Sequence, residues 1–133
     1  VNVVVSVAGT VKCSHAFQHD IRLFEIDNIW HTYIGGGGDF YSDKPEHLYG
    51  VSGAAQEWWG EPEVEPFMVL WHTCGGTPKC LCKALPDTSE DLRMHIDIDL
   101  EDYEKSGFNK CVQSLEDCEY TMKHNWLKGG VKE

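Results

Sequence analysis

The amino-acid sequence predicts an all-β protein, an antiparallel β-sandwich or open barrel, with a short disulfide-closed appendage at its C-terminal end. Residues 92–100 alternate apolar and polar side chains, which is typical of a half-buried strand. Residues 3–12 are rich in β-branched side chains, which suit a pleated surface. Residues 63–82 hold an apolar run, a Gly-Gly-Thr-Pro turn and a Cys-Leu-Cys run, which together indicate a β-hairpin.

The remaining predicted strands follow from the same patterns. Residues 21–27, IRLFEID, alternate and form the second strand, whereas the polar residues 14–20 before them read as a loop. Pro66 has no amide proton for a helix interior, so the run that it begins is a strand rather than a helix. The predicted strands are therefore residues 3–12, 21–27, 66–74, 80–85 and 92–100.

The middle of the chain is harder to interpret. Residues 28–50 mix aromatic side chains with four consecutive glycines at 35–38. The glycines lack the lysine and the strand-to-helix context of a phosphate-binding P-loop, so a flexible loop is the preferred interpretation. Residues 51–59 have the length of one strand or of one short helical segment, and the sequence leaves both open.

After residue 104 the pattern changes, so we expect a sandwich domain over 1–104 and an appendage over 105–133. Apolar residues recur there at helical spacing, namely Val112, Leu115, Cys118 and Met122.

The six cysteines favour three disulfides, and hence an oxidising compartment and a secreted protein. The apolar start of the chain is expected to be the mature end left after signal removal, and no stretch is long enough to span a bilayer. Side chains two apart on a strand share a face, so Cys80 and Cys82 need separate partners. The predicted pairs are Cys74 with Cys80, Cys82 with Cys13, and Cys111 with Cys118.

Three metal sites are alternatives that the sequence leaves open. The Cys-x-Cys run near His72 could hold zinc as thiolates and imidazole. His15 and His19 could form a clip, although they fall in the predicted loop. The acidic side chains after residue 96 could hold calcium, but their spacing is not that of an EF-hand, and a solvated face is preferred. These acidic residues are Asp97, Asp99, Glu101, Asp102 and Glu104. The prediction is no metal and no cofactor.

The formal net charge of the chain is −11. This charge repels phosphate backbones, which excludes a nucleic-acid role, and it opposes an anionic membrane unless a local basic patch intervenes. The acidity could equally serve solubility alone.

Several segments of the chain form a recognisable set. They are GTVKC at 9–13, IRLFEID at 21–27, EPFMVLWHTC at 65–74, the second cysteine cluster, and HIDIDLE at 95–101. With these segments the chain resembles the nematode transthyretin-like family of small secreted proteins. The resemblance implies a prealbumin-like sandwich over roughly residues 3–101. The aromatic, glycine-rich insertion at 30–49 stands where the family has an Asp-x-x-Gly-x-Phe turn, and the tail after 104 has no counterpart.

The resemblance also implies a function. At least one family member is similar to a bridging protein that links phosphatidylserine on dying cells to a phagocyte receptor, so anionic phospholipid and a cell-surface receptor are the expected partners in apoptotic cell clearance. Alternatives are a carrier of a small apolar ligand and a secreted protein-binding effector. Catalysis is not expected, because the chain lacks the Tyr-Arg-Gly-Ser of the hydroxyisourate hydrolases that share the fold, and shows no triad spacing.

Exposed aromatic and basic side chains are the candidate ligand contacts, since aromatic rings suit the membrane interface and lysines suit anionic head groups. Burial of the adjacent tryptophans at a sandwich edge is the alternative. The candidates are Trp58, Trp59, Trp30, Tyr33, Lys79 and Lys83.

Overall fold

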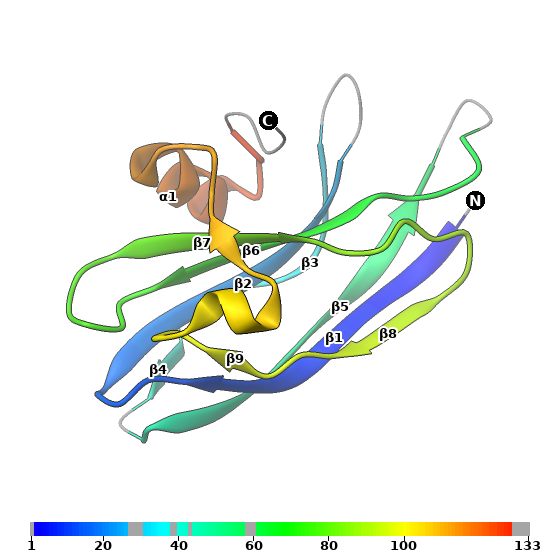
Figure 1. Ribbon diagram of the computed structural model, residues 1–133. Coiled ribbons are helices and arrows are strands. Elements are labelled where there is room, and N and C mark those ends of the chain that lie inside the picture. Colours follow the sequence, from blue (N-terminus) through cyan, green and yellow to red (C-terminus); the bar gives the residue numbers. More distant parts are fainter. Residues whose placement is uncertain (1, 27–30, 38–39, 43, 58–60, 129–133) are drawn as a thin grey trace.

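The computed structural model describes residues 2–26, 31–37, 40–42, 44–57 and 61–128 (Figure 1). The strands in this part of the chain are β1 (Asn2–Lys12), β2 (Phe17–Glu25), β3 (Thr32–Gly36), β4 (Phe40–Ser42), β5 (Glu46–Gln56), β6 (Pro66–His72), β7 (Lys79–Ala84), β8 (Leu92–His95), β9 (Ile98–Asp99) and β10 (Asn109–Lys110). One 3-10 turn, η1 (Tyr103–Ser106), and one helix, α1 (Leu115–His124), accompany them. The all-β prediction is confirmed.

The strands form one curled sheet in the order β10-β7-β6-β2-β3-β5-β1-β8, with β4 beside β2 and β9 beside β1. The two halves of the sheet face each other, as in a sandwich or open barrel (Figure 1). One detail of the prediction is wrong, because β8 and β9 run parallel to β1 rather than antiparallel. The cause is the connection at residues 85–91, which leaves the β7 end of the sheet and crosses to the far side of β1.

The main core lies between the two halves. Along β1, Val3, Val5, Val7 and Val11 expose 3% or less of their surface, and they pack with apolar side chains of β2, β6 and β7. Each such burial contributes about 1.5–3 kcal/mol. The strand predicted at residues 3–12 is therefore confirmed.

Two predicted element boundaries are wrong. The second strand begins at Phe17 rather than at residue 21, because residues 19–25 pair with β6 along their whole length. The strand predicted at 92–100 is broken between β8 and β9, where the Asp97 carboxylate accepts hydrogen bonds from the backbone N–H and the hydroxyl of Thr10.

The disulfides differ from all three predicted pairs. They join Cys13 to Cys74, Cys80 to Cys118, and Cys82 to Cys111. Cys80 and Cys82 do share a face, as alternation requires, but this is the outer face of β7, which points toward the C-terminal segment rather than toward β1. The predicted bridge of the appendage to itself is thereby replaced by two bridges to the sheet.

These two bridges hold the C-terminal segment on the sheet. β10 pairs with β7, and α1 covers the outer face of β6 and β7 (Figure 1). Cys118, Met122 and Leu127 pack there against Phe67 and Val69. Within the described residues, no helix has the length and apolar character needed to cross a membrane.

A close approach of two glycines joins the halves of the sheet. β3 and β5 share one register pair, Gly35 with Gly53. A Cβ atom added at Gly53 would stand 1.8 Å from the Ile34 carbonyl oxygen, and one at Gly35 would stand 2.0 Å from the Ser52 carbonyl oxygen. The flexible loop predicted for the first glycines of the 35–38 run is therefore wrong: Gly35 and Gly36 belong to β3 because only glycine allows this approach.

We expect Gly53→Ala to lower the melting temperature strongly, since the added methyl group would force β3 away from β5. Gly50→Ala in the same strand is the matched control, because a Cβ there would meet only the Ala8 Cβ at 4.0 Å. Thermal unfolding followed by circular dichroism measures both. Equal melting temperatures for the two variants would contradict the role of the Gly53 contact.

Candidate ligand-binding site

Three lysines gather on one face of β7 and β10. Lys79 and Lys83 flank Leu81 at alternating positions of β7, so the three side chains project on the same side of the strand. Lys110 is the register partner of Leu81 and projects on that side too, since paired residues of neighbouring strands share a face. We call Lys79, Lys83 and Lys110 the lysine face.

The lysines of this face form no ion pair with a carboxylate in the part of the chain that the structure describes. Lys12 pairs with Asp99 and Lys128 pairs with Asp117, and neither pair involves the lysine face. Lys79 and Lys110 are exposed, and Lys83 is half-buried with its ammonium group against Gly107. In a chain with a net charge of −11, this face gathers three of the eleven lysine and arginine side chains.

A pocket of about 250 Å³ opens beside Lys79 and Lys110. Its walls are mainly apolar, formed by Leu81, Leu100 and Leu115 together with one half of each β7 disulfide. An apolar wall next to ammonium groups accommodates a molecule that has both an anionic and an apolar part.

A buried amide lies at the same pocket. Gln113 exposes 8% of its surface, and neither its amide oxygen nor its amide nitrogen has a hydrogen-bond partner in the part of the chain that the structure describes. An unsatisfied buried amide costs about 1–3 kcal/mol. A water molecule or a polar ligand group at this end of the pocket would remove that cost.

His72 forms the inner wall of the pocket and is neutral at physiological pH. Burial, followed by the nearby charges of Lys79 and His19, lowers the pKa of His72 from 6.5 to about 4. Its Nδ1 accepts a hydrogen bond of 3.0 Å from the Cys74 N–H, which places the ring proton on Nε2. The ring is therefore an N–H donor held in one orientation by the β6–β7 turn.

The structure brings together only part of the predicted ligand site. Lys79 and Lys83 lie on one face, as proposed, whereas Trp30, Trp58 and Trp59 fall outside the described residues. Tyr33 is half-buried on β3, far along the sheet order from β7, and its hydroxyl donates to the Gly36 carbonyl. Its ring packs edge-on against Phe24, so Tyr33 supports the outer apolar cluster.

Sequence reasoning missed Lys110 and Gln113. Nothing in the residues around Lys110 distinguishes it from other lysines of the charged C-terminal segment. The pairing of Cys82 with Cys111 would have found it, because this disulfide places Lys110 beside Leu81.

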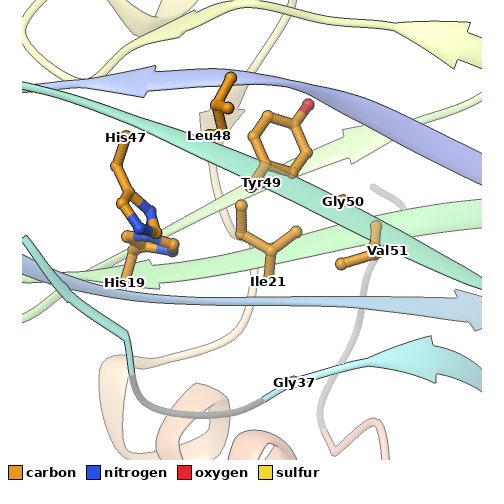
Figure 2. A pocket seen from close by; sticks show the side chains of 8 residues that line it. All are labelled: His19, Ile21, Gly37, His47, Leu48, Tyr49, Gly50 and Val51. Carbon is orange, nitrogen blue, oxygen red and sulfur yellow. The ribbon is translucent and has the colours of Figure 1, made fainter.

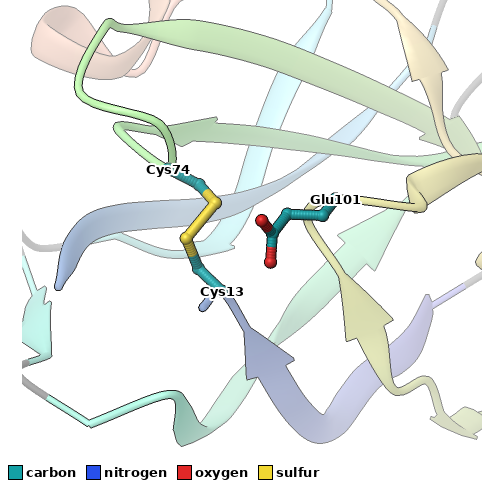
Figure 3. Close-up of side chains that lie close together, drawn as sticks. All are labelled: Cys13, Cys74 and Glu101. Carbon is teal, nitrogen blue, oxygen red and sulfur yellow. A yellow bond between two sulfur atoms is a disulfide. The ribbon is translucent and has the colours of Figure 1, made fainter. Parts of the chain in front are cut away.

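The cysteines cannot form the zinc site that the sequence left open. All six form disulfides, so none offers the thiolate that zinc requires, and the zinc alternative at His72 is wrong. The Glu101 carboxylate does lie beside the Cys13–Cys74 bridge (Figure 3). Both of its oxygens accept hydrogen bonds from Ser14, the backbone N–H at 2.9 Å and the hydroxyl at 2.7 Å, so the group is a structural contact.

The acidic side chains after residue 90 do more than face the solvent, because three of them hold this segment against β1. Asp91, Asp97 and Glu101 each accept a hydrogen bond from a backbone N–H in or directly after β1, with the same sequence separation of 87 residues. Hydrogen bonds from Thr10 lower the pKa of Asp97, and those from Ser14 lower the pKa of Glu101. These carboxylates fasten the segment 91–101 alongside β1.

His15 and His19 do not form the histidine clip considered from the sequence. His15 is exposed in the turn before β2, while His19 is buried inside β2. The imidazole that approaches His19 is His47 of β5.

Comparison with known proteins gives the chain no family. No protein-family model matches the sequence, and no curated protein matches it. The resemblance to the transthyretin-like family therefore stays a prediction.

We expect the free energy of unfolding to fall as the pH falls from 6.5 to 4. The pKa values of His19 and His72 are lowered to about 4, so between these pH values the unfolded chain binds protons that the folded chain does not. Each histidine contributes a slope of about 1.4 kcal/mol per pH unit. Denaturant unfolding at several pH values measures it.

His72→Asn should reduce the slope of the unfolding free energy against pH by the contribution of one histidine. The asparagine amide oxygen replaces Nδ1 as the acceptor for the Cys74 N–H, and the amide does not titrate. His15→Asn, at an exposed histidine, is the control and should leave the slope unchanged. The same slope in wild type and His72→Asn would refute the contribution of His72.

Proposed function

We propose that this protein is a non-enzymatic, extracellular recognition protein that binds anionic phospholipid head groups through the lysine face. The observation that carries the proposal is the lysine face, whose three lysines form no ion pair among the described residues and two of which, Lys79 and Lys110, border an apolar pocket. The chain that carries this face has a net charge of −11. Phosphatidylserine on dying cells is the proposed lipid, and a phagocyte receptor bound by another face is the proposed second partner.

Apolar side chains beside the lysine face support a membrane surface as the source of the anion. Val112, between β10 and α1, is 54% exposed, and Leu115, the first residue of α1, is 41% exposed. At a membrane interface, lysines can reach the head-group phosphates while neighbouring apolar side chains contact the boundary of the acyl chains. The contribution of each lysine is about 1 kcal/mol and is screened by salt.

The extracellular location is supported by the three disulfides, which persist in oxidising compartments. The receptor partner is supported by the sequence resemblance alone. Trp58 and Trp59 remain separate predicted anchors of the same interaction.

We expect the triple variant Lys79→Ala, Lys83→Ala, Lys110→Ala to bind phosphatidylserine vesicles about 100-fold more weakly at low salt, which corresponds to the loss of about 3 kcal/mol. The difference from wild type should shrink as salt is raised, because ionic attraction is screened. Co-sedimentation with vesicles of 30% phosphatidylserine and with neutral phosphatidylcholine vesicles measures binding.

The triple variant Lys12→Ala, Lys123→Ala, Lys128→Ala is the matched control, since it removes the same charge from other surfaces. It should bind nearly as well as wild type. Equal losses of vesicle binding in both triple variants would show that the net charge, and not the lysine face, causes the effect. Failure of the wild-type protein to co-sediment would overturn the lipid proposal.

A further inference from the structure

A second pocket, of about 330 Å³, lies between β2 and β5. His19 and His47 meet at one end of it, and Ile21, Tyr49 and Val51 form its apolar walls (Figure 2). His19 Nε2 and His47 Nδ1 are 2.9 Å apart. The two strands thus place one imidazole nitrogen each, His19 Nε2 from β2 and His47 Nδ1 from β5, at the same end of the pocket.

Strand pairing fixes the positions of these two imidazoles. The side chain of His19 exposes 1% of its surface, and its position in β2 is set by pairing with His72 of β6. His47 is set by its pairing with Val11 of β1. Because both backbones belong to paired strands, the two nitrogens are positioned before any ligand arrives.

The separation of the nitrogens matches that of two ligands on one metal ion. Two imidazole nitrogens bound at about 2.0–2.1 Å and at right angles around a metal lie about 2.9 Å apart. Right-angled nitrogen ligands are typical of tetragonal Cu²⁺ and Ni²⁺ sites, and Cu²⁺ binds such ligands most strongly among the divalent first-row metals.

We propose that His19 and His47 form a two-histidine site for a divalent transition-metal ion, with Cu²⁺ as the ion that fits it best. The metal binds both nitrogens from beside the line that joins them, and the two rings turn their lone pairs toward it, which displaces the proton of the hydrogen bond between them. That proton moves to the other nitrogen of the ring that donates it, so the pair binds as two neutral imidazoles and releases no proton. Waters in the pocket complete the coordination.

Two features of the surroundings favour neutral ligands over a charged pair. Burial, and then the proximity of His47, lowers the pKa of His19 to about 4, so this ring carries no charge at physiological pH. His72, the third imidazole nearby, does not compete for the ion through Nδ1, since that atom is held by the Cys74 N–H. The site is independent of the proposed lipid binding.

The test is titration of EDTA-treated, disulfide-intact protein with CuCl₂ in a glycine buffer, followed by calorimetry and electron paramagnetic resonance. We expect one equivalent of Cu²⁺ with a tetragonal spectrum and coupling to two imidazole nitrogens. Bound Cu²⁺ should also raise the melting temperature, because it links β2 to β5, whereas CaCl₂ should not.

His47→Asn is the informative variant, because its amide occupies the position of Nδ1 and keeps a hydrogen bond to His19 but is a poor copper ligand. It should keep the metal-free melting temperature and bind Cu²⁺ at least tenfold more weakly. His95→Asn, at an exposed histidine paired with Asp97, is the matched control and should bind as wild type does. Unchanged Cu²⁺ affinity in His47→Asn, or a spectrum without nitrogen coupling, would overturn the proposal.

Discussion

The disulfide between Cys82 and Cys111 is the constraint on which the candidate lipid site depends. It holds the chain after η1 alongside β7, so that β10 can pair there and Lys110 faces the same side as Leu81. The neighbouring bridge from Cys80 to Cys118 then fixes the start of α1 and brings Leu115 over the pocket. Without these two covalent links, the lysines of β7 would border an open sheet edge rather than a pocket.

Hydrogen bonding explains how an acidic protein can still offer lysines for binding. Asp91, Asp97 and Glu101 accept backbone hydrogen bonds in or after β1, so these carboxylates are engaged elsewhere. Lys79 and Lys110 form no ion pair among the described residues, although Leu100 of the same acidic segment lines their pocket. The net charge repels an anionic surface at long range, which salt screens beyond roughly 10 Å, while local contacts determine what binds.

Local patterns predicted β1, β6 and β7 well but missed β3, β4 and the first half of β5, and the partners of the strands could not be predicted from them. Alternation places Val5 and Val7 inside because a strand has a fixed period, whatever it pairs with. The disulfide map depends instead on which strand lies next to β7, and alternation carries no such information. For the same reason the sequence named Lys79 and Lys83 but not Lys110, and it assigned His19 to a loop although β6 and His47 make it part of the core.

The glycine run shows a different limit. Gly35 and Gly53 stand 18 positions apart in the sequence, and neither position alone reveals that two backbones must touch there. Glycine is compatible with a loop and with a close approach, so composition favours the more common case. The parallel pairing of β8 was hidden in the same way, since it depends on the path of the connection and not on the residues of the strand.

The position of β1 has a consequence for biosynthesis. β1 is made before either of its neighbours, which are β5 and, on the other edge, β8 and β9, whose pairing begins at Leu92. A nascent chain therefore carries a β-branched apolar segment with one open edge until about residue 99 has emerged, and contacts of such high sequence separation form slowly. This exposed edge is the point at which newly made chains would aggregate, and a chaperone that covers residues 2–12 during synthesis would protect the fold.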